Sequence, residues 1–298
     1  MGLAEAQHQE TDIAVPAGGW ALRAFYLVFW GWLLLRWTND YLLKGLVVAP
    51  GAPFVDPATL APYSAELAFA VRYLPRLAGG AWLTLLLTVA AIAGGFVIAV
   101  PLSVARVYGH YTRWVALVYT ELIRGTPMLA QLFVLYYGLQ LSSWVRVLPF
   151  VGVGPIPNQA FWVAIIGLII NSSAYQGEYI RAAIGSVDVG QLTAARAVGL
   201  SQLEGIRYVV LPQGLRYAIP AWSNELIYLI KYSSLAAFIT VPELYEVAKR
   251  IASQNFQYVA IFSLVAIIYL GMVITASNLM EIVADRVAIP GLGHARSR

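Results

Sequence analysis

The segment QLTAARAVGLSQLEGIRYVVLPQGLR, residues 191–216, is a polar interruption in a chain that is otherwise mostly apolar. Good helix formers fill Val189–Ala197, and Gly199 follows where a helix end favours a residue that adopts the left-handed conformation. A second helix is predicted from Ser201, because apolar side chains recur there at three- and four-residue steps. Pro212 then ends this helix or opens the next one. The pattern predicts a helix–glycine–helix unit.

The composition of the rest of the chain indicates a membrane protein. Of 298 residues, 60% are hydrophobic and only 11% are charged, and the mean hydropathy is +0.70. A soluble domain carries roughly 25% charged residues, so this chain lacks the polar surface that a water-soluble globule needs. A net charge of +4, spread along the chain, does not indicate a nucleic-acid partner.

Six apolar segments are each long enough for the roughly 20 residues that cross a bilayer core. Because backbone groups in lipid must be satisfied internally, we predict helices and therefore an all-α polytopic membrane protein. Its parts would be a tail, a helix and a Pro/Ala-rich loop at 1–62, a five-helix region at 63–290 and a tail at 291–298. The predicted spans are Trp20–Trp37, Ala81–Val104, Trp114–Leu141, Ala160–Ala183, Tyr217–Val241 and Phe256–Val283.

The distribution of Lys and Arg favours a cytoplasmic location for residues 191–216. Ten basic residues fall on that side of the predicted spans and six on the other. With six spans, both termini would also be cytoplasmic, in a multi-pass protein of the cell membrane. The ten are Arg106, Arg113, Arg124, Arg181, Arg196, Arg207, Arg216, Arg286, Arg296 and Arg298, and the six are Lys44, Arg72, Arg76, Arg146, Lys249 and Arg250.

The sequence contains none of the common catalytic or cofactor motifs. No lysine lies in the Gly-Lys-Ser/Thr context of a phosphate-binding loop, so we expect no nucleotide site. Three scattered histidines and no cysteine give no zinc-ligand spacing. Gly199-Leu200-Ser201 begins like a nucleophile elbow, but position 203 is Leu. We expect neither an enzyme nor a bound cofactor or metal.

Residues 193–212 resemble the EAA loop of ABC importer permeases. The family pattern is Glu-Ala-Ala, three residues, Gly, nine residues and Ile-x-Leu-Pro, and the spacing here is the same. Thr193 replaces the usual Glu, which removes a charge and any salt bridge that it would make, and Val209 replaces Ile. The residues that this resemblance assigns to ATPase coupling are Thr193, Ala194, Ala195, Gly199, Leu211 and Pro212.

Further matches, in family order over about Leu83 to Leu244, are similar to the polar amino acid permeases of the histidine/glutamine/arginine type. Gly177, Tyr232 and Ser233 depart from the usual Ala, Asp and Thr. The matching pieces are LTLLLT at 83–88, RGTP at 124–127, QLF at 131–133, AYQGEYIR at 174–181, PQ at 212–213, Pro220, Asn224 and KYSSL at 231–235.

This resemblance implies a type I ABC importer fold, a five-helix core to which the chain adds one N-terminal transmembrane helix. It implies a second permease subunit, identical or different, two cytoplasmic ABC ATPases that use ATP, and an extracellular or periplasmic amino-acid-binding protein. The helix–glycine–helix unit would insert into a groove of the ATPase. From the residues alone, an amphipathic loop resting on the lipid headgroups is the alternative.

Polar and charged side chains within the predicted spans are candidates for a substrate path, since such groups are costly in lipid. Glu178 and Arg181, at i and i+3, either pair with each other or meet a substrate's charges. The polar run at 171–176 either joins helices or lines a path. At 124–127 we predict Thr126 as a helix cap with Pro127 at the first position. The path candidates are Ser172, Tyr175, Gln176, Glu178, Asn224 and Lys231.

The sequence thus predicts a permease subunit that moves a polar amino acid and is coupled to a separate ATPase through residues 191–212. Two other classes stay open. One is a secondary transporter that works alone on an ion gradient, although no inverted repeat with broken helices is found. The other is a membrane scaffold that transports nothing.

Overall fold

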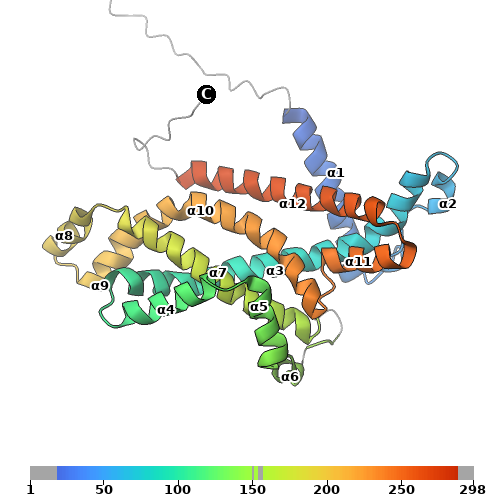
Figure 1. Cartoon of the computed structure of the whole chain (residues 1–298). Coiled ribbons are helices and arrows are strands. Elements are labelled where there is room, and N and C mark those ends of the chain that lie inside the picture. The colour runs from blue at the N-terminus through green and yellow to red at the C-terminus, as the bar shows by residue number, and fades with distance from the viewer. Residues whose placement is uncertain (1–18, 150, 154–156, 288–298) are drawn as a thin grey trace, which may run out of the picture.

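The structure, a computed structural model, describes residues 19–149, 151–153 and 157–287, and within them every regular element is a helix. The tail predicted at 291–298 lies outside the described residues. In Figure 1 the long helices α3, α7, α10 and α12 run along the molecule, with α8 and α9 at one end and α2 and α11 at the other.

The described helices follow in chain order, with short π-helical or 3-10 turns after four of them. They are α1 (Gly19–Trp37), η1 (Thr38–Leu42), α2 (Pro57–Leu60), α3 (Ala65–Tyr108), α4 (Thr112–Arg124), α5 (Met128–Phe133), η2 (Val134–Gly138), α6 (Leu141–Arg146), α7 (Gln159–Gly185), α8 (Val189–Ala197), α9 (Gln202–Gly205), η3 (Ile206–Val210), α10 (Leu211–Tyr232), η4 (Ser233–Ile239), α11 (Leu244–Asn255) and α12 (Tyr258–Val287).

Helix α3 begins well before the predicted span. The Ser64 hydroxyl caps it by accepting a hydrogen bond from the Leu67 amide, and the helix then continues for 44 residues. At 1.5 Å per residue it is about 66 Å long, roughly twice the hydrocarbon core of a bilayer. The helix is therefore longer than one crossing needs, and its N-terminal part lies beside α2 and α11.

The predicted span Trp114–Leu141 is wrong as a single helix. Helix α4 ends at Arg124, and Pro127 prevents its continuation because it lacks an amide hydrogen and restricts the residue before it. The prediction of Thr126 as the cap of α5 is also wrong: Pro127 occupies the cap position. The Thr126 hydroxyl instead donates to the Leu122 carbonyl, 2.9 Å away, at the end of α4.

A second break follows α10. The chain passes through η4 to Thr240, which adopts the left-handed conformation, and α11 then leaves at 54°. Among the described helices, α3, α7 and α12 are long and apolar enough to cross a membrane, and α10 with α11 makes a fourth if the bent pair is one span. The count of six spans stays a prediction.

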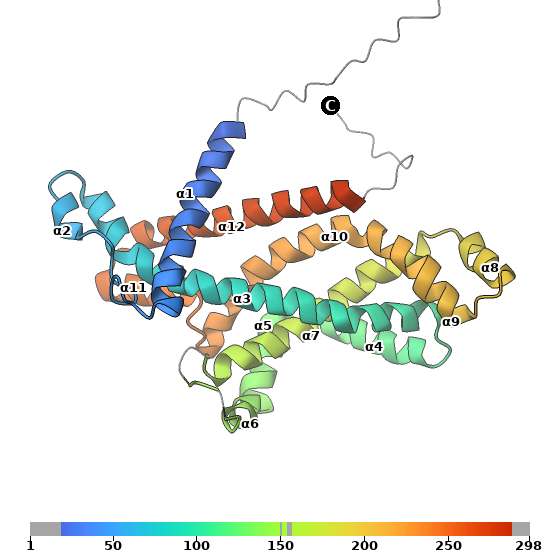
Figure 2. The same ribbon diagram turned by 180° about the vertical axis from the view of Figure 1, so that it is seen from behind.

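Helix α1 packs against the bundle, as Figure 2 shows from behind. The indole of Trp30 donates to Thr275 of α12 at 2.9 Å, and that of Trp37 donates to the Ala78 carbonyl of α3 at 2.7 Å. Both bonds satisfy an indole N–H in an apolar setting, where an unpaired donor is costly. These contacts fix α1 across α12 and α3.

The contact between α3 and the start of α11 is a backbone-to-backbone approach at Gly80. A Cβ at Gly80 would lie 2.7 Å from Leu244 Cα and 2.9 Å from Leu244 N. Because these are backbone atoms, no side-chain rotation relieves the overlap, and a side chain at position 80 would force α3 and α11 apart.

We expect Gly80→Ala to lower the thermal unfolding temperature of the purified protein in detergent. The overlap corresponds to about 1–3 kcal/mol, as for overpacked cores. The control is Gly31→Ala on α1, where the added Cβ meets no atom within 4 Å. Equal unfolding temperatures for the two variants would contradict the assigned contact.

Candidate functional site

The helix–glycine–helix unit forms as the sequence predicts. Helix α8 covers Val189–Ala197, and Gly199 adopts a φ of +95°, a conformation that L side chains rarely take. Sequence reasoning missed a capping box, in which Ser201 caps α9 and Glu204 reaches back to the Ser201 amide. The hydrogen bonds from the Ser201 hydroxyl and amide lower the pKa of Glu204 below its ordinary value.

The predicted coupling residues differ in exposure. Thr193, Ala194, Gly199 and Pro212 are exposed, Leu211 is half-buried, and Ala195 is buried. Pro212 lies in the first turn of α10, so it opens that helix. The exposed small residues leave the outer side of the unit open to a close approach by another chain.

A second feature is a cavity of about 290 Å³ between α7 and α10. Two tyrosines from each helix contribute their rings at i and i+4, and the remaining lining is one amide and one carboxylate. Such a mixture of aromatic faces with a few polar groups is typical of sites for small polar molecules. The lining residues are Asn171, Tyr175, Tyr179, Glu225, Tyr228 and Tyr232.

The carboxylate of this cavity is held from α7. Glu225 is only 4% exposed and accepts a hydrogen bond from the Ser172 hydroxyl at 2.8 Å. Gln176 donates in turn to the Ser172 hydroxyl at 2.8 Å and to the Ile92 carbonyl of α3 at 3.1 Å. Ser172 and Gln176, both predicted to lie on the path, are buried and brace Glu225 without lining the cavity.

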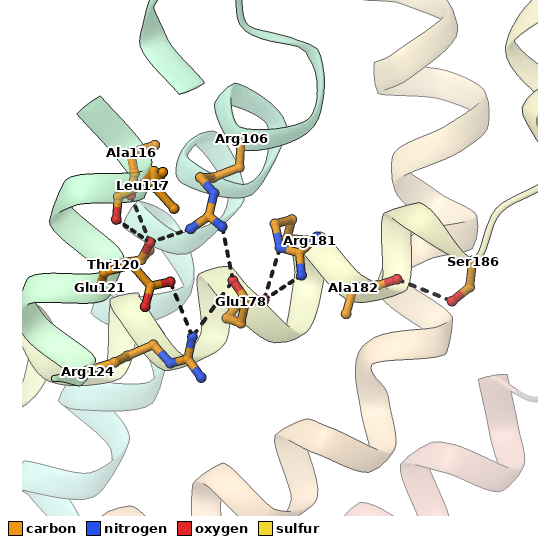
Figure 3. Close-up of polar contacts among 10 residues, drawn as sticks. All are labelled: Arg106, Ala116, Leu117, Thr120, Glu121, Arg124, Glu178, Arg181, Ala182 and Ser186. Atoms are coloured by element: carbon orange, nitrogen blue, oxygen red, sulfur yellow. Dashed lines mark hydrogen bonds and ion pairs between the residues drawn. The ribbon is translucent and has the colours of Figure 1, made fainter. Parts of the chain in front are cut away.

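A cluster of charged side chains joins α3, α4 and α7 around Glu178 (Figure 3). Arg181 donates to Glu178 Oε1 from Nη2 at 2.5 Å and from Nε at 3.0 Å, so these residues form the i, i+3 pair that was one of the two alternatives left open by the sequence. Glu178 Oε2 lies 3.6 Å from Arg106 Nη2 and 3.9 Å from Arg124 Nη1. Arg106 also donates to the Thr120 hydroxyl of α4. One carboxylate thus links three helices.

Two of the remaining predicted residues, Tyr175 and Lys231, lie at or beside the cavity. Tyr175 lines it, and the guanidinium carbon of Arg124 lies 5.5 Å from the Tyr175 ring centroid. The ammonium of Lys231 lies 5.5 Å from the ring centroid of Tyr228. Asn224 is exposed on α10.

The sequence reasoning did not assign Tyr179, Tyr228 or Tyr232 to the site. The signal was the repeated Tyr spacing of four residues on two predicted spans, which places each pair on one helix face. Among the described residues, no group of three or more His, Asp or Glu side chains is placed to hold a metal ion.

Comparison with known proteins identifies the family. The protein family described as the binding-protein-dependent transport system inner membrane component matches residues 91–289 of this chain. The chain belongs to this family of ABC importer permeases. Permeases of this kind are transport subunits and not enzymes, and the match confirms the resemblance that the EAA-like loop indicated.

Three relatives named as transport permeases match most of this permease. A probable amino-acid ABC transporter permease, YckA of Bacillus subtilis, is 38% identical over 220 residues, 74% of this chain and 92% of its own. The glutamine permease GlnP of Escherichia coli is 36% identical over 218 residues, 72% and 94%. The nopaline permease NocM of Agrobacterium fabrum is 35% identical over 216 residues, 72% and 89%.

Solved structures give the same fold. The crystal structure of an amino acid ABC transporter with histidines matches with a TM-score of 0.61 and 33% identity, over 78% of this chain and 99% of that one. An inward-facing MetNI methionine transporter matches with a TM-score of 0.60 at 18% identity, over 72% and 97%. This permease therefore has the helical fold of type I ABC importers.

We expect Glu178→Gln to destabilise the permease by roughly 1–3 kcal/mol, because it leaves the guanidinium groups of Arg106 and Arg181 without their shared carboxylate. Breaking a fully buried pair costs about 3–5 kcal/mol, and solvent reduces this for partly exposed groups. Thermal unfolding in detergent measures the loss. The control is Glu281→Gln on α12, an exposed position. A Glu178 variant as stable as the control would mean that the cluster does not hold α3, α4 and α7 together.

Proposed function

We propose that this chain forms the membrane path by which an ATP-driven importer moves a polar amino acid into the cell. The observation that carries the proposal is the cavity between α7 and α10, where one buried carboxylate, one amide and four tyrosines meet. A carboxylate and aromatic faces both attract an ammonium group. The amino-acid permeases among the relatives support the same substrate class.

Exposed polar side chains on α4 and α10 support a second permease subunit, identical or different. Glu121 of α4 is 60% exposed, and Asn224 and Lys231 of α10 are exposed as well. Charged groups facing lipid at membrane depth are costly, so such groups face protein or a water-filled path. A partner covering α4 and α10 would complete that path, and lipid would cover the apolar outer faces.

The unit formed by α8 and α9 is proposed as the contact with the ATPase that uses ATP. It presents exposed small residues next to Val198, which is 79% exposed, and Leu203, which is 70% exposed. A short helix with apolar and small side chains fits a hydrophobic groove. The excess of Arg on this side of the spans supports a cytoplasmic location for it and for both termini. The amino-acid-binding protein would then approach the opposite end, near α2 and α11.

Transport in vesicles tests the proposal directly. The permease is reconstituted with its ATPase and binding protein, and uptake of a labelled mixture of proteinogenic L-amino acids is followed with and without internal ATP. We expect uptake only with ATP and with the ATPase present. Uptake by the permease alone on an ion gradient would favour the secondary transporter, and no uptake under any condition would favour the scaffold.

We expect Ala194→Trp to reduce recovery of the ATPase in a pull-down by at least about tenfold, as for a central contact residue. Ala194 lies on a helical turn and is exposed, so the indole fits the isolated loop but prevents close approach. A change at Gly199 is less informative, because its φ of +95° strains any side chain.

The matched control is Ala58→Trp on α2, exposed at the other end of the molecule. Recovery of the ATPase with Ala194→Trp at the level of this control would remove α8 from the contact.

A further inference from the structure

Arg124 is the last residue of α4, and its charged guanidinium group has few hydrogen-bond acceptors close to it. Its Nε is buried, and no acceptor among the described residues takes its hydrogen. Its two nearest carboxylates, Glu121 and Glu178, lie 3.9 Å from Nη1, beyond hydrogen-bond distance. A guanidinium has five N–H donors and stays charged, so this is a costly arrangement inside a membrane protein.

The other cations of the cluster are in a different position. Arg181 makes two hydrogen bonds to Glu178, and Arg106 donates to the Thr120 hydroxyl. Figure 3 shows Arg124 reaching from α4 into the space between Glu121 and Glu178. Three guanidinium groups share two carboxylates there, so the cluster has one positive charge in excess.

Arg124 also lies beside the cavity. Its guanidinium carbon is 5.5 Å from the ring centroid of Tyr175, which lines the cavity, and its side chain is 32% exposed. The cavity is thus lined by the carboxylate of Glu225, and the guanidinium of Arg124, whose donors lack close acceptors, lies at the edge of the cavity. An amino acid carries the two complementary charges, an ammonium and a carboxylate, on one carbon atom.

We propose that Arg124 binds the α-carboxylate of the transported amino acid, while Glu225 and the tyrosine faces receive its ammonium group. The inference rests on the proposed function and specifies how the same cavity orients its substrate. A carboxylate that reaches Arg124 forms the bidentate pair that suits a guanidinium, and it satisfies donors that Glu121 and Glu178 leave free. Little is lost when the side chain turns, because the contacts it leaves are long.

This arrangement also gives selectivity for the amino acid backbone. Every amino acid has the α-carboxylate, so the contact suits a permease whose delivered substrate is chosen elsewhere. An amine or an amide of the same side chain lacks the anion and leaves Arg124 uncompensated. Hydrogen bonds to charged groups are strong enough to change binding by about 10- to 100-fold.

The first experiment needs no variant. The permease with its ATPase in nanodiscs is treated with the arginine reagent phenylglyoxal, and labelling of Arg124 and of Arg286 is followed by peptide mass spectrometry. We expect a mixture of proteinogenic L-amino acids to slow labelling of Arg124, and the mixture of their α-amides to leave it unchanged. Labelling of Arg286, exposed on α12, stays the same throughout. Equal protection by acids and amides, or none by either, would overturn the proposal.

The second experiment is amino acid uptake by vesicles that contain the permease, its ATPase and the binding protein. We expect Arg124→Gln to reduce uptake by about 10- to 100-fold and Arg124→Lys, which keeps the charge, to reduce it less. Arg286→Gln is the control. If the wild type transports and Arg124→Gln matches the control, the carboxylate contact is wrong although the permease function stands. If the wild type transports no amino acid, the proposed function fails, and this inference with it.

Discussion

The structure depends on which partners the polar side chains of helix α7 find, because a helix within a bilayer cannot leave such side chains in lipid. From Asn171 to Arg181, α7 carries amides, hydroxyls and two opposite charges. Each of these groups can be satisfied only by a neighbouring helix, by a side chain of α7 itself or by water. The positions of α3, α4 and α10 around α7 follow from that requirement.

Two sets of contacts satisfy the polar side chains of α7 in different ways. Toward one end of α7, Glu178 binds Arg181 and approaches Arg106 and Arg124, which joins α3 and α4 to α7. Nearer its middle, Ser172 and Gln176 hold Glu225 of α10. The first set connects helices by charge, and the second fixes one carboxylate against a cavity. The same helix therefore provides both the framework and the polar wall of the proposed path.

The two proposed tasks, passage of the substrate and contact with the ATPase, belong to different positions along the long axis of the bundle. The cavity lies between α7 and α10, and the unit of α8 and α9 connects these same two helices at one end of the molecule. The proposed ATPase contact is therefore continuous in the chain with both helices that line the cavity. This continuity gives a physical route by which a partner at that end can alter a path inside the bundle.

Local chemistry in the sequence determined the all-helical membrane class, the helix at Val189–Ala197 and the left-handed turn at Gly199, because periodicity and glycine geometry act over a few residues. It also offered the Glu178–Arg181 pair, a contact within one helical turn, as one of two alternatives. Only the tertiary structure decided the rest. It joined Ser172 to Glu225 and Gln176 to Ser172, and it brought four tyrosines to one cavity, because these outcomes depend on which helices face each other.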